Sequence, residues 1–127
     1  MIPPEDIEKE TKRLKMRYKI INEMMQTEQT FLQDMIVMEE EYNAFCYDCS
    51  LVSKRHQQTI FGRTKYVVAF SSTFYKDLSI AAGKYVDTEE SLIVEAGYEQ
   101  LLDWDAQTSI GEAFWSSVNV LRDNTEF

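Results

Sequence analysis

The residues from Glu5 to Phe45 contain neither glycine nor proline, and apolar side chains recur along them at steps of three and four. The apolar stripe is formed by Leu14, Tyr18, Ile21, Met25, Leu32, Met35 and Tyr42, with gaps at Glu28 and Glu39. A second row, Met24, Phe31, Met38 and Phe45, makes the stripe wider than the seam of a two-stranded coiled coil. The stretch therefore predicts one amphipathic helix of about forty residues, roughly 60 Å long at 1.5 Å per residue.

One acidic residue of this helix points away from the apolar stripe. At 100° per residue, Glu23 lies about 200° around the helix from both Ile21 and Met25. The residues three, four or seven positions from it are polar: Lys19, Gln26, Thr27 and Thr30. From pattern alone, this polar strip is typical of a solvated helix face, and a binding surface is the alternative.

Composition favours a helical fold. The chain has 127 residues, enough for one domain with its own core, and 44% of them are hydrophobic. It has four glycines and two prolines, both near the start, which is too few for many short strands joined by turns. We expect an all-α, elongated helical bundle.

Charge and hydropathy narrow the functional classes. A net charge of −9 disfavours binding to phosphate backbones, so nucleic acid is not an expected partner. Basic residues gather at 9–19 and 54–65, but too sparsely for a lipid-binding patch. We expect no transmembrane segment, because no apolar run reaches eighteen residues, and no signal peptide, because the chain opens with Ile2-Pro3-Pro4-Glu5-Asp6. Two cysteines without a secretory signal indicate a cytoplasmic location.

Further helices are predicted beyond the first. Turn-prone residues at 47–50 predict a break, with Ser50 or Ser53 capping the next helix. The spacing of apolar residues resumes at Ile60 and predicts a second helix of about 25 residues, reaching Tyr85. Its apolar positions are Val67, Phe74, Leu78 and Ala81, with Thr64 and Ser71 filling the gaps.

Two more helices are expected after Gly83. Thr88 with Ser91, or Asp87 with Glu90, fits the start of a third helix. Its apolar segment runs to Trp104, with a break near Gly97. A turn at 105–109 then leads into a fourth helix from Ile110. The highly charged residues before Leu14 suggest a helical extension that projects from the body or frays.

Candidate catalytic groups are scarce. The single histidine, His56, lies in a polar stretch that is typical of a loop or helix start. Cys46 and Cys49 have the spacing of zinc and redox sites, but a second cysteine pair is missing and no strand precedes them. The acidic run Glu39–Glu41 lacks the histidine partners of a di-iron site. We therefore predict no metal, no cofactor and no catalytic residue, and a binding surface instead.

Residues 17–35 resemble the first conserved region of Dbl-homology domains, the exchange-factor modules for Rho-family GTPases. The positions that carry the resemblance are Glu23, Thr27, Glu28, Phe31 and Asp34, with methionine in place of leucine at several others. Residues 60–78, from Ile60-Phe61-Gly62 through Phe70 and Phe74 to Leu78, are similar to the second region. Ile110-Gly111-Glu112-Ala113-Phe114 is similar to a later Ile-Gly-Asp step.

The resemblance covers residues 15–122 and suggests two parts. Residues 1–14 form a charged helical lead, and residues 15–127 form a partial domain of the Dbl-homology type. Such domains normally continue through a third conserved region and a long last helix, so we expect this chain to correspond to the N-terminal part of one.

The resemblance implies a function without covalent chemistry. In the family, the glutamate matching Glu23 contacts switch I of the GTPase, so Glu23, Lys19, Gln26, Thr27 and Thr30 become the expected GTPase-binding residues. Glu28 falls on the apolar stripe, and we expect it to form a buried or semi-buried hydrogen bond or ion pair within the bundle, and not a contact with a partner.

Three matters stay open beside the exchange-factor interpretation. A helical interaction module without exchange activity is the alternative, since uncovered apolar faces, with Phe31, Phe74 and Trp115 as candidates, would favour homo-oligomers. A metal or redox role for Cys46 and Cys49 is a third hypothesis. Recruitment to the membrane or cell cortex would require domains outside this sequence.

Overall fold

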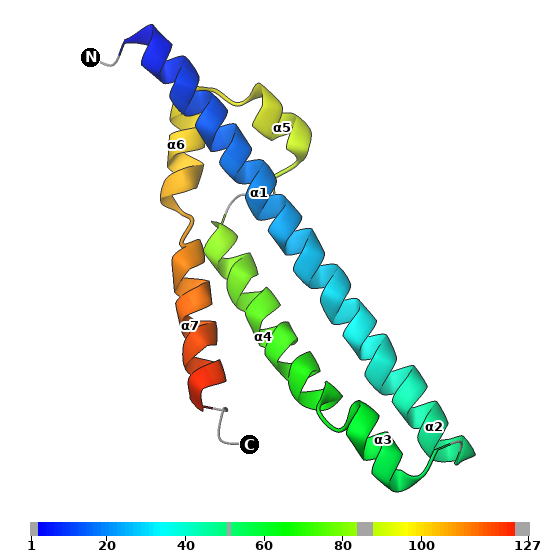
Figure 1. Ribbon diagram of the computed structural model, residues 1–127. Coiled ribbons are helices and arrows are strands. Elements are labelled where there is room, and N and C mark those ends of the chain that lie inside the picture. The colour runs from blue at the N-terminus through cyan, green and yellow to red at the C-terminus, as the bar shows by residue number, and fades with distance from the viewer. Residues whose placement is uncertain (1–2, 51, 84–87, 124–127) are drawn as a thin grey trace. The chain divides into compact units, whose positions relative to one another are not determined.

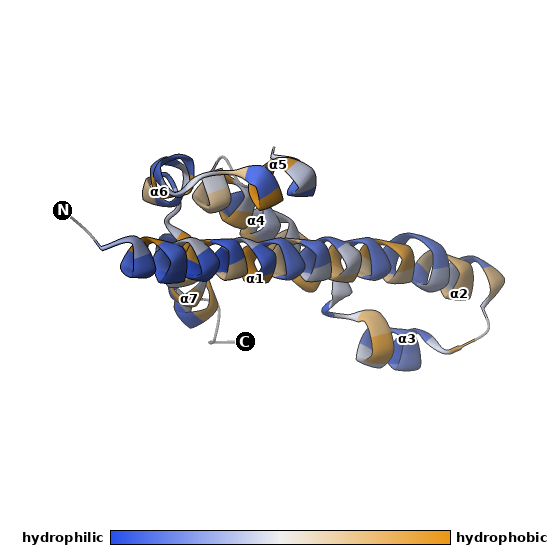
Figure 2. Ribbon diagram, turned by 90° about the horizontal axis from the view of Figure 1, so that it is seen from above, coloured by the Kyte–Doolittle hydropathy of each residue, from blue (hydrophilic) through white to orange (hydrophobic). Residues whose placement is uncertain are grey.

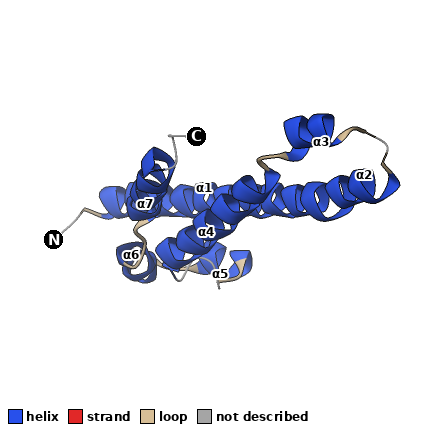
Figure 3. Ribbon diagram, turned by 90° about the horizontal axis from the view of Figure 1, so that it is seen from below, coloured by secondary structure: helices blue, strands red, loops and turns tan. Residues whose placement is uncertain are grey.

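The computed structural model describes residues 3–50, 52–83 and 88–123, and every secondary-structure element in those ranges is helical (Figure 3). The elements, labelled in Figure 1, are α1 (Pro4–Val37), the π-helix η1 (Met38–Asn43), α2 (Ala44–Cys49), α3 (Lys54–Phe61), α4 (Thr64–Ala82), α5 (Glu90–Glu95), α6 (Tyr98–Ala106) and α7 (Ile110–Asp123). The all-α prediction is confirmed. None of the helices described is long and apolar enough to cross a membrane.

The predicted long helix is present, and it contains a π-helical segment. α1 has 34 residues, and the backbone stays helical through η1 into α2, because Val37, Asn43 and Ala44 all have right-handed helical angles (Figure 1). Asn43 donates hydrogen bonds of 3.3 Å to both carboxylate oxygens of Glu39, which links the two ends of η1. Hydrophilic and hydrophobic residues alternate along α1, as amphipathic packing requires (Figure 2).

The chain divides into two compact units. The first comprises Met1–Met25 and Lys76–Phe127, and the second comprises Gln26–Tyr75. The first unit holds most of the buried apolar side chains. They are Leu14, Tyr18, Ile21 and Met25 of α1, Leu78, Ala81 and Ala82 of α4, Ile93 and Ala96 at α5, Leu101 and Trp104 of α6, and Ala113 of α7.

The core of the first unit follows the predicted stripe. Leu14, Tyr18, Ile21 and Met25 are spaced by four, three and four residues, which places them on one side of α1. Leu14 is fully buried, and the helix already begins ten residues before it, at Pro4. Proline suits this position because the first helical residue needs no backbone N–H donor.

Few side chains are buried in the second unit. Among its described residues, Thr64, Ser71 and Phe74 are buried, all on α4 at positions that the sequence predicted. Phe74 was a candidate for an uncovered apolar residue, and this prediction is wrong because only 9% of its surface is exposed. It stacks on Phe70 with 6.0 Å between the ring centroids, one turn away on the same helix.

Neither the second apolar row nor the C-terminal half of the main stripe becomes core. In the second row, Phe31, Met38 and Phe45 are exposed and Met24 is half-buried. In the main stripe, Leu32 and Met35 are half-buried and Tyr42 is exposed. Periodicity alone indicates that a face is apolar, and it does not say how much of that face finds a partner.

The single helix predicted from Ile60 to Tyr85 is wrong at its start. Gly62 and Arg63 separate α3 from α4, and Ile60 is exposed near the end of α3. Glycine has low helix propensity, and a Cβ at Gly62 would collide with the carbonyl oxygen of Gln58. The other end of the prediction, Tyr85, lies outside the described residues.

The helix ends follow known capping rules, with one exception. α2 ends at Ser50 in the left-handed conformation, and Ser53 caps α3 by accepting a hydrogen bond from the His56 amide. Gly83 has a φ of 59° and ends α4, as its position predicted. The start predicted at Thr88 is wrong, because Glu89 occupies the N-cap of α5 without a side-chain hydrogen bond. The alternative residue Asp87 lies outside the described residues.

Candidate functional site

The five residues predicted to bind a GTPase are all exposed on α1. Lys19 and Glu23 lie in the first unit, and Gln26, Thr27 and Thr30 lie in the second, along the same helix. Among the described residues, no hydrogen bond or ion pair engages any of these five side chains. Their polar groups are therefore available to a partner.

Two large apolar residues lie next to Glu23 on the same face of α1. Met16 and Ile20 precede Glu23 by seven and three residues, and they are 57% and 53% exposed. Lys19 follows Met16 by three residues and completes this group, which we call the Glu23 face: Met16, Lys19, Ile20 and Glu23. The sequence signal that could have identified Met16 and Ile20 is their position outside the apolar stripe.

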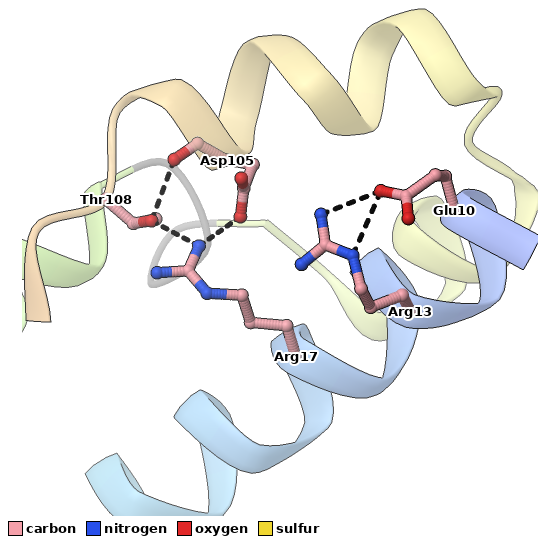
Figure 4. A network of polar contacts seen from close by, with 5 residues as sticks. All are labelled: Glu10, Arg13, Arg17, Asp105 and Thr108. Atoms are coloured by element: carbon pink, nitrogen blue, oxygen red, sulfur yellow. Dashed lines mark hydrogen bonds and ion pairs between the residues drawn. The ribbon is translucent and has the colours of Figure 1, made fainter. Parts of the chain in front are cut away.

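The other side of α1 is fixed to the first unit by polar contacts as well as by its core residues. The Arg17 guanidinium forms an ion pair with Asp105 of α6, and the same nitrogen donates a 2.5 Å hydrogen bond to the Thr108 hydroxyl (Figure 4). Lys15 donates a 2.7 Å hydrogen bond to the carbonyl oxygen of Val94 at α5. These contacts orient α1 against α5 and α6.

Tyr18 adds a partly polar contact to this attachment. Its ring is buried, and its hydroxyl lies 3.5 Å from the carbonyl oxygen of Thr88. Burial, and next the negative charge of Glu90, raise the pKa of the Tyr18 phenol above its ordinary value. The neutral phenol is therefore the form that fits this site.

The turn between α6 and α7 brings the polar partners of Arg17 together. Thr108 donates a 2.8 Å hydrogen bond to the Asp105 carbonyl oxygen, and the Ser109 amide donates a 2.7 Å hydrogen bond to the Ala81 carbonyl oxygen at the end of α4. The sequence predicted a turn at 105–109 but gave no signal for its link to Arg17, because 88 residues separate Arg17 from Asp105.

The sequence also singled out Glu28, the two cysteines and His56 as candidate residues. Glu28 is half-buried, but the hydrogen bond or ion pair expected for it does not occur among the described residues. Cys46 and Cys49 are free thiols, and the described residues contain no group of three histidines, cysteines or acids that could hold a metal ion. His56 is an exposed residue in the first turn of α3.

Comparison with known proteins decides the family. Residues 20–126 match the family model of the RhoGEF domain, which is most of the chain. The chain belongs to the RhoGEF domain family. The match begins just before Glu23 and includes every helix from the second half of α1 to α7.

A curated relative supports the assignment over a shorter stretch. The chain is 32% identical over 72 residues to the Rho guanine nucleotide exchange factor gef1 of Schizosaccharomyces pombe. This alignment covers 57% of the chain and 10% of the relative, so this RhoGEF chain spans a small part of the length of that protein. No solved structure matches the chain.

Proposed function

We propose that this chain is a guanine nucleotide exchange module that binds a Rho-family small GTPase through the Glu23 face and promotes release of GDP. Membership of the RhoGEF family supports the partner class. The observation that carries the choice of surface is the exposed, unengaged carboxylate of Glu23 on a helix whose opposite side is held by Leu14, Tyr18 and Ile21.

The chemistry of the Glu23 face suits a protein partner. Two apolar side chains, Met16 and Ile20, flank a carboxylate and an ammonium, and such mixed patches are typical of protein interfaces. Gln26, Thr27 and Thr30 continue along α1 and supply further hydrogen-bonding groups. A preformed helix adds affinity because little conformational entropy is lost on binding.

Exchange then follows from linkage between two binding equilibria. If the chain binds the nucleotide-free GTPase more tightly than the GDP-bound form, it must weaken GDP binding by the same factor. No bond is made or broken in the exchange module, so the reaction needs only binding groups. The free energy needed to change the conformation of the GTPase is offset because the exchange module binds the nucleotide-free form more tightly than the GDP-bound form.

The test is release of fluorescent GDP from a panel of Rho-family GTPases. We expect the chain to accelerate release from at least one of them, and Glu23→Ala to reduce the acceleration at least about tenfold, equivalent to about 1.4 kcal/mol. Glu40→Ala is the matched control, because Glu40 is also an exposed glutamate and lies outside the Glu23 face. Equal activity of Glu23→Ala and Glu40→Ala would refute the assigned surface.

A second function, self-association, is favoured by α7. This helix carries five exposed large apolar residues, Phe114, Trp115, Val118, Val120 and Leu121, of which Trp115 is 65% exposed. Their spacing places Phe114, Val118 and Leu121 along one side. Phe31, the other remaining candidate for an uncovered apolar residue, is exposed on α1.

Multi-angle light scattering tests the second function. A dimer that Trp115→Glu converts to monomer, with helicity by circular dichroism unchanged, would support self-association through α7. Binding of a GTPase without accelerated release of GDP would support the non-catalytic interaction module. A strictly monomeric chain at high concentration would remove self-association.

A further inference from the structure

The second unit contains a solvent-open cavity at its surface that the proposed exchange function does not use. It has a volume of about 310 Å³, within the size range of small-molecule sites. Its lining comes from η1, α2, α3 and the start of α4, and includes Glu39, Tyr47, Lys54, Phe61 and Lys65. Four helical elements therefore contribute residues to one concave site.

The polar wall of this cavity is organised by hydrogen bonds. The side-chain amide of Asn43 donates a hydrogen bond to the Glu39 carboxylate. The Gln57 side-chain amide donates a 2.8 Å hydrogen bond to the side-chain oxygen of Asn43 and a 3.1 Å hydrogen bond to its carbonyl oxygen. The Thr64 hydroxyl contacts Glu39 as well. The Glu39 carboxylate is thus held by neutral donors, and no cation neutralises it within the described residues.

The lining also includes two basic residues. Lys54 and Lys65 line the cavity, and neither forms an ion pair with any described residue. Two ammonium groups against one carboxylate give the cavity a net positive charge, although the chain as a whole carries −9. The sequence from 54 to 65 contains four lysines and arginines and no acid. An anion is therefore the ligand that the charges favour.

The start of α3 supports the same conclusion. The first two residues of this helix are Lys54 and Arg55, and no acid lies in its first turn. Cations at a helix N-terminus are unfavourable, because the macrodipole is positive there. When a sequence departs from such a local preference and no contact within the chain compensates for it, the position is often part of a functional site. An anion bound against Lys54 would compensate it.

We propose that this cavity binds a small organic phosphate monoester. The monoester is close to doubly charged at neutral pH, which matches two lysines, and lysine is a common phosphate ligand. The cavity is larger than a phosphate group, and Phe61 and Tyr47 offer aromatic surface to an organic part. A soluble metabolite and the headgroup of phosphatidic acid both present this chemistry. The proposal is independent of exchange activity.

An amide NMR titration with phenyl phosphate tests the proposal. We expect saturable shifts in η1, α3 and the start of α4, and at least tenfold weaker effects from phenol, which has the ring without the phosphate. Lys54→Met and Lys65→Met should each raise the dissociation constant at least about fivefold. Lys76→Met, which removes an exposed lysine outside the cavity, should leave it unchanged.

Sedimentation with vesicles distinguishes the two sources. The vesicles are phosphatidylcholine with either phosphatidic acid or phosphatidylserine, at equal total charge. Stronger binding to the vesicles with phosphatidic acid, if Lys54→Met abolishes this preference, would assign the lipid headgroup as the ligand. Response to phenyl phosphate alone would assign a soluble monoester. Circular dichroism verifies that each variant is folded. The proposal is overturned if neither probe binds, if phosphatidylserine serves equally well, or if Lys76→Met weakens binding as much as Lys54→Met.

Discussion

Arg17 has two polar partners on a distant part of the chain, whereas its neighbour Arg13 has a local one. Arg17 contacts Asp105 and Thr108 (Figure 4). Both charged side chains of this ion pair are about two-thirds buried or more. Arg13 pairs with Glu10 three residues earlier, and both side chains are considerably more exposed. Solvent screens the second pair more strongly, so the two arginines should differ in their contribution to stability.

Arg17→Ala should therefore lower the free energy of unfolding by about 1–2 kcal/mol, since it removes the ion pair, the hydrogen bond to Thr108 and part of the packing of α1 on α6. Arg13→Ala, the matched control, should lower it by about 0.5 kcal/mol or less. Urea unfolding followed by circular dichroism measures both. Equal losses would show that the link to Asp105 contributes nothing beyond a surface ion pair.

The buried phenol of Tyr18 predicts a dependence of stability on alkaline pH. Its pKa in the folded chain is raised above 10.0, by burial first and by Glu90 second. Between 10 and the folded pKa, the unfolded chain loses the phenolic proton while the folded chain retains it, so stability falls as pH rises. Below about pH 10 both states are protonated, and the stability associated with this group is fully present.

The measurement compares the wild-type chain with Tyr18→Phe in urea unfolding from pH 8 to pH 11. The long contact to Thr88 is weak, so the variant should lose little stability at pH 8. Above pH 10 the wild type should lose stability more steeply than the variant, because phenylalanine has no proton to release. Parallel curves would mean that the phenol titrates equally in the folded and unfolded states.

At the scale of the elements, the end of α4 depends on glycine. Gly83 has a φ of 59°, and a Cβ there would lie 2.6 Å from the carbonyl oxygen of Gln107. The Ser109 amide bonds to the Ala81 carbonyl oxygen at the same helix end, so the turn after α6 cannot easily move away. A substituted residue would meet both backbone strain and a steric clash.

We expect Gly83→Ala to lower the unfolding free energy by about 1–3 kcal/mol. Gly111→Ala is the control, because Gly111 is the second residue of α7 and a Cβ there meets open space. Alanine should stabilise that helix by up to about 1 kcal/mol. Thermal and urea unfolding of the two variants test the contrast. A stable Gly83→Ala chain would show that α4 can end in another conformation.

The sequence predicted helices well where the spacing of apolar residues and the positions of glycine, proline and turn-forming residues indicated the same boundaries. Leu14, Tyr18 and Ile21 are core residues because a long uninterrupted helix has a well-defined apolar face. The break at Gly62 was missed because the apolar spacing continues across it, and local spacing does not report a clash with Gln58.

The candidate surface was only partly predictable. The orientation of Glu23 followed from helical geometry, but the exposure of Met16 and Ile20 depends on which faces find partners in the folded chain. The cavity near Lys54 and Lys65 requires tertiary placement of four elements. No local pattern encodes that placement.

At the scale of the whole molecule, the two units differ in how much they bury. The first holds most of the apolar core, whereas the described part of the second buries three side chains, Thr64, Ser71 and Phe74, two of them polar. The Ser71 hydroxyl has no hydrogen-bond partner among the residues that the structure describes, which reduces the stability gained from its burial. Regions with few buried apolar contacts open at lower free energy than the global unfolding transition.

Hydrogen exchange followed by mass spectrometry should therefore show two classes of backbone amide. Peptides from 14–25 and 98–106 should exchange at least about tenfold more slowly than peptides from 38–61, once rates are divided by those of the unfolded chain. A phosphate monoester that occupies the cavity should selectively slow exchange in 38–61, since a ligand stabilises the state that binds it. Uniform protection along the chain would contradict this prediction. It would mean that both units open in a single transition although they bury different amounts of apolar surface.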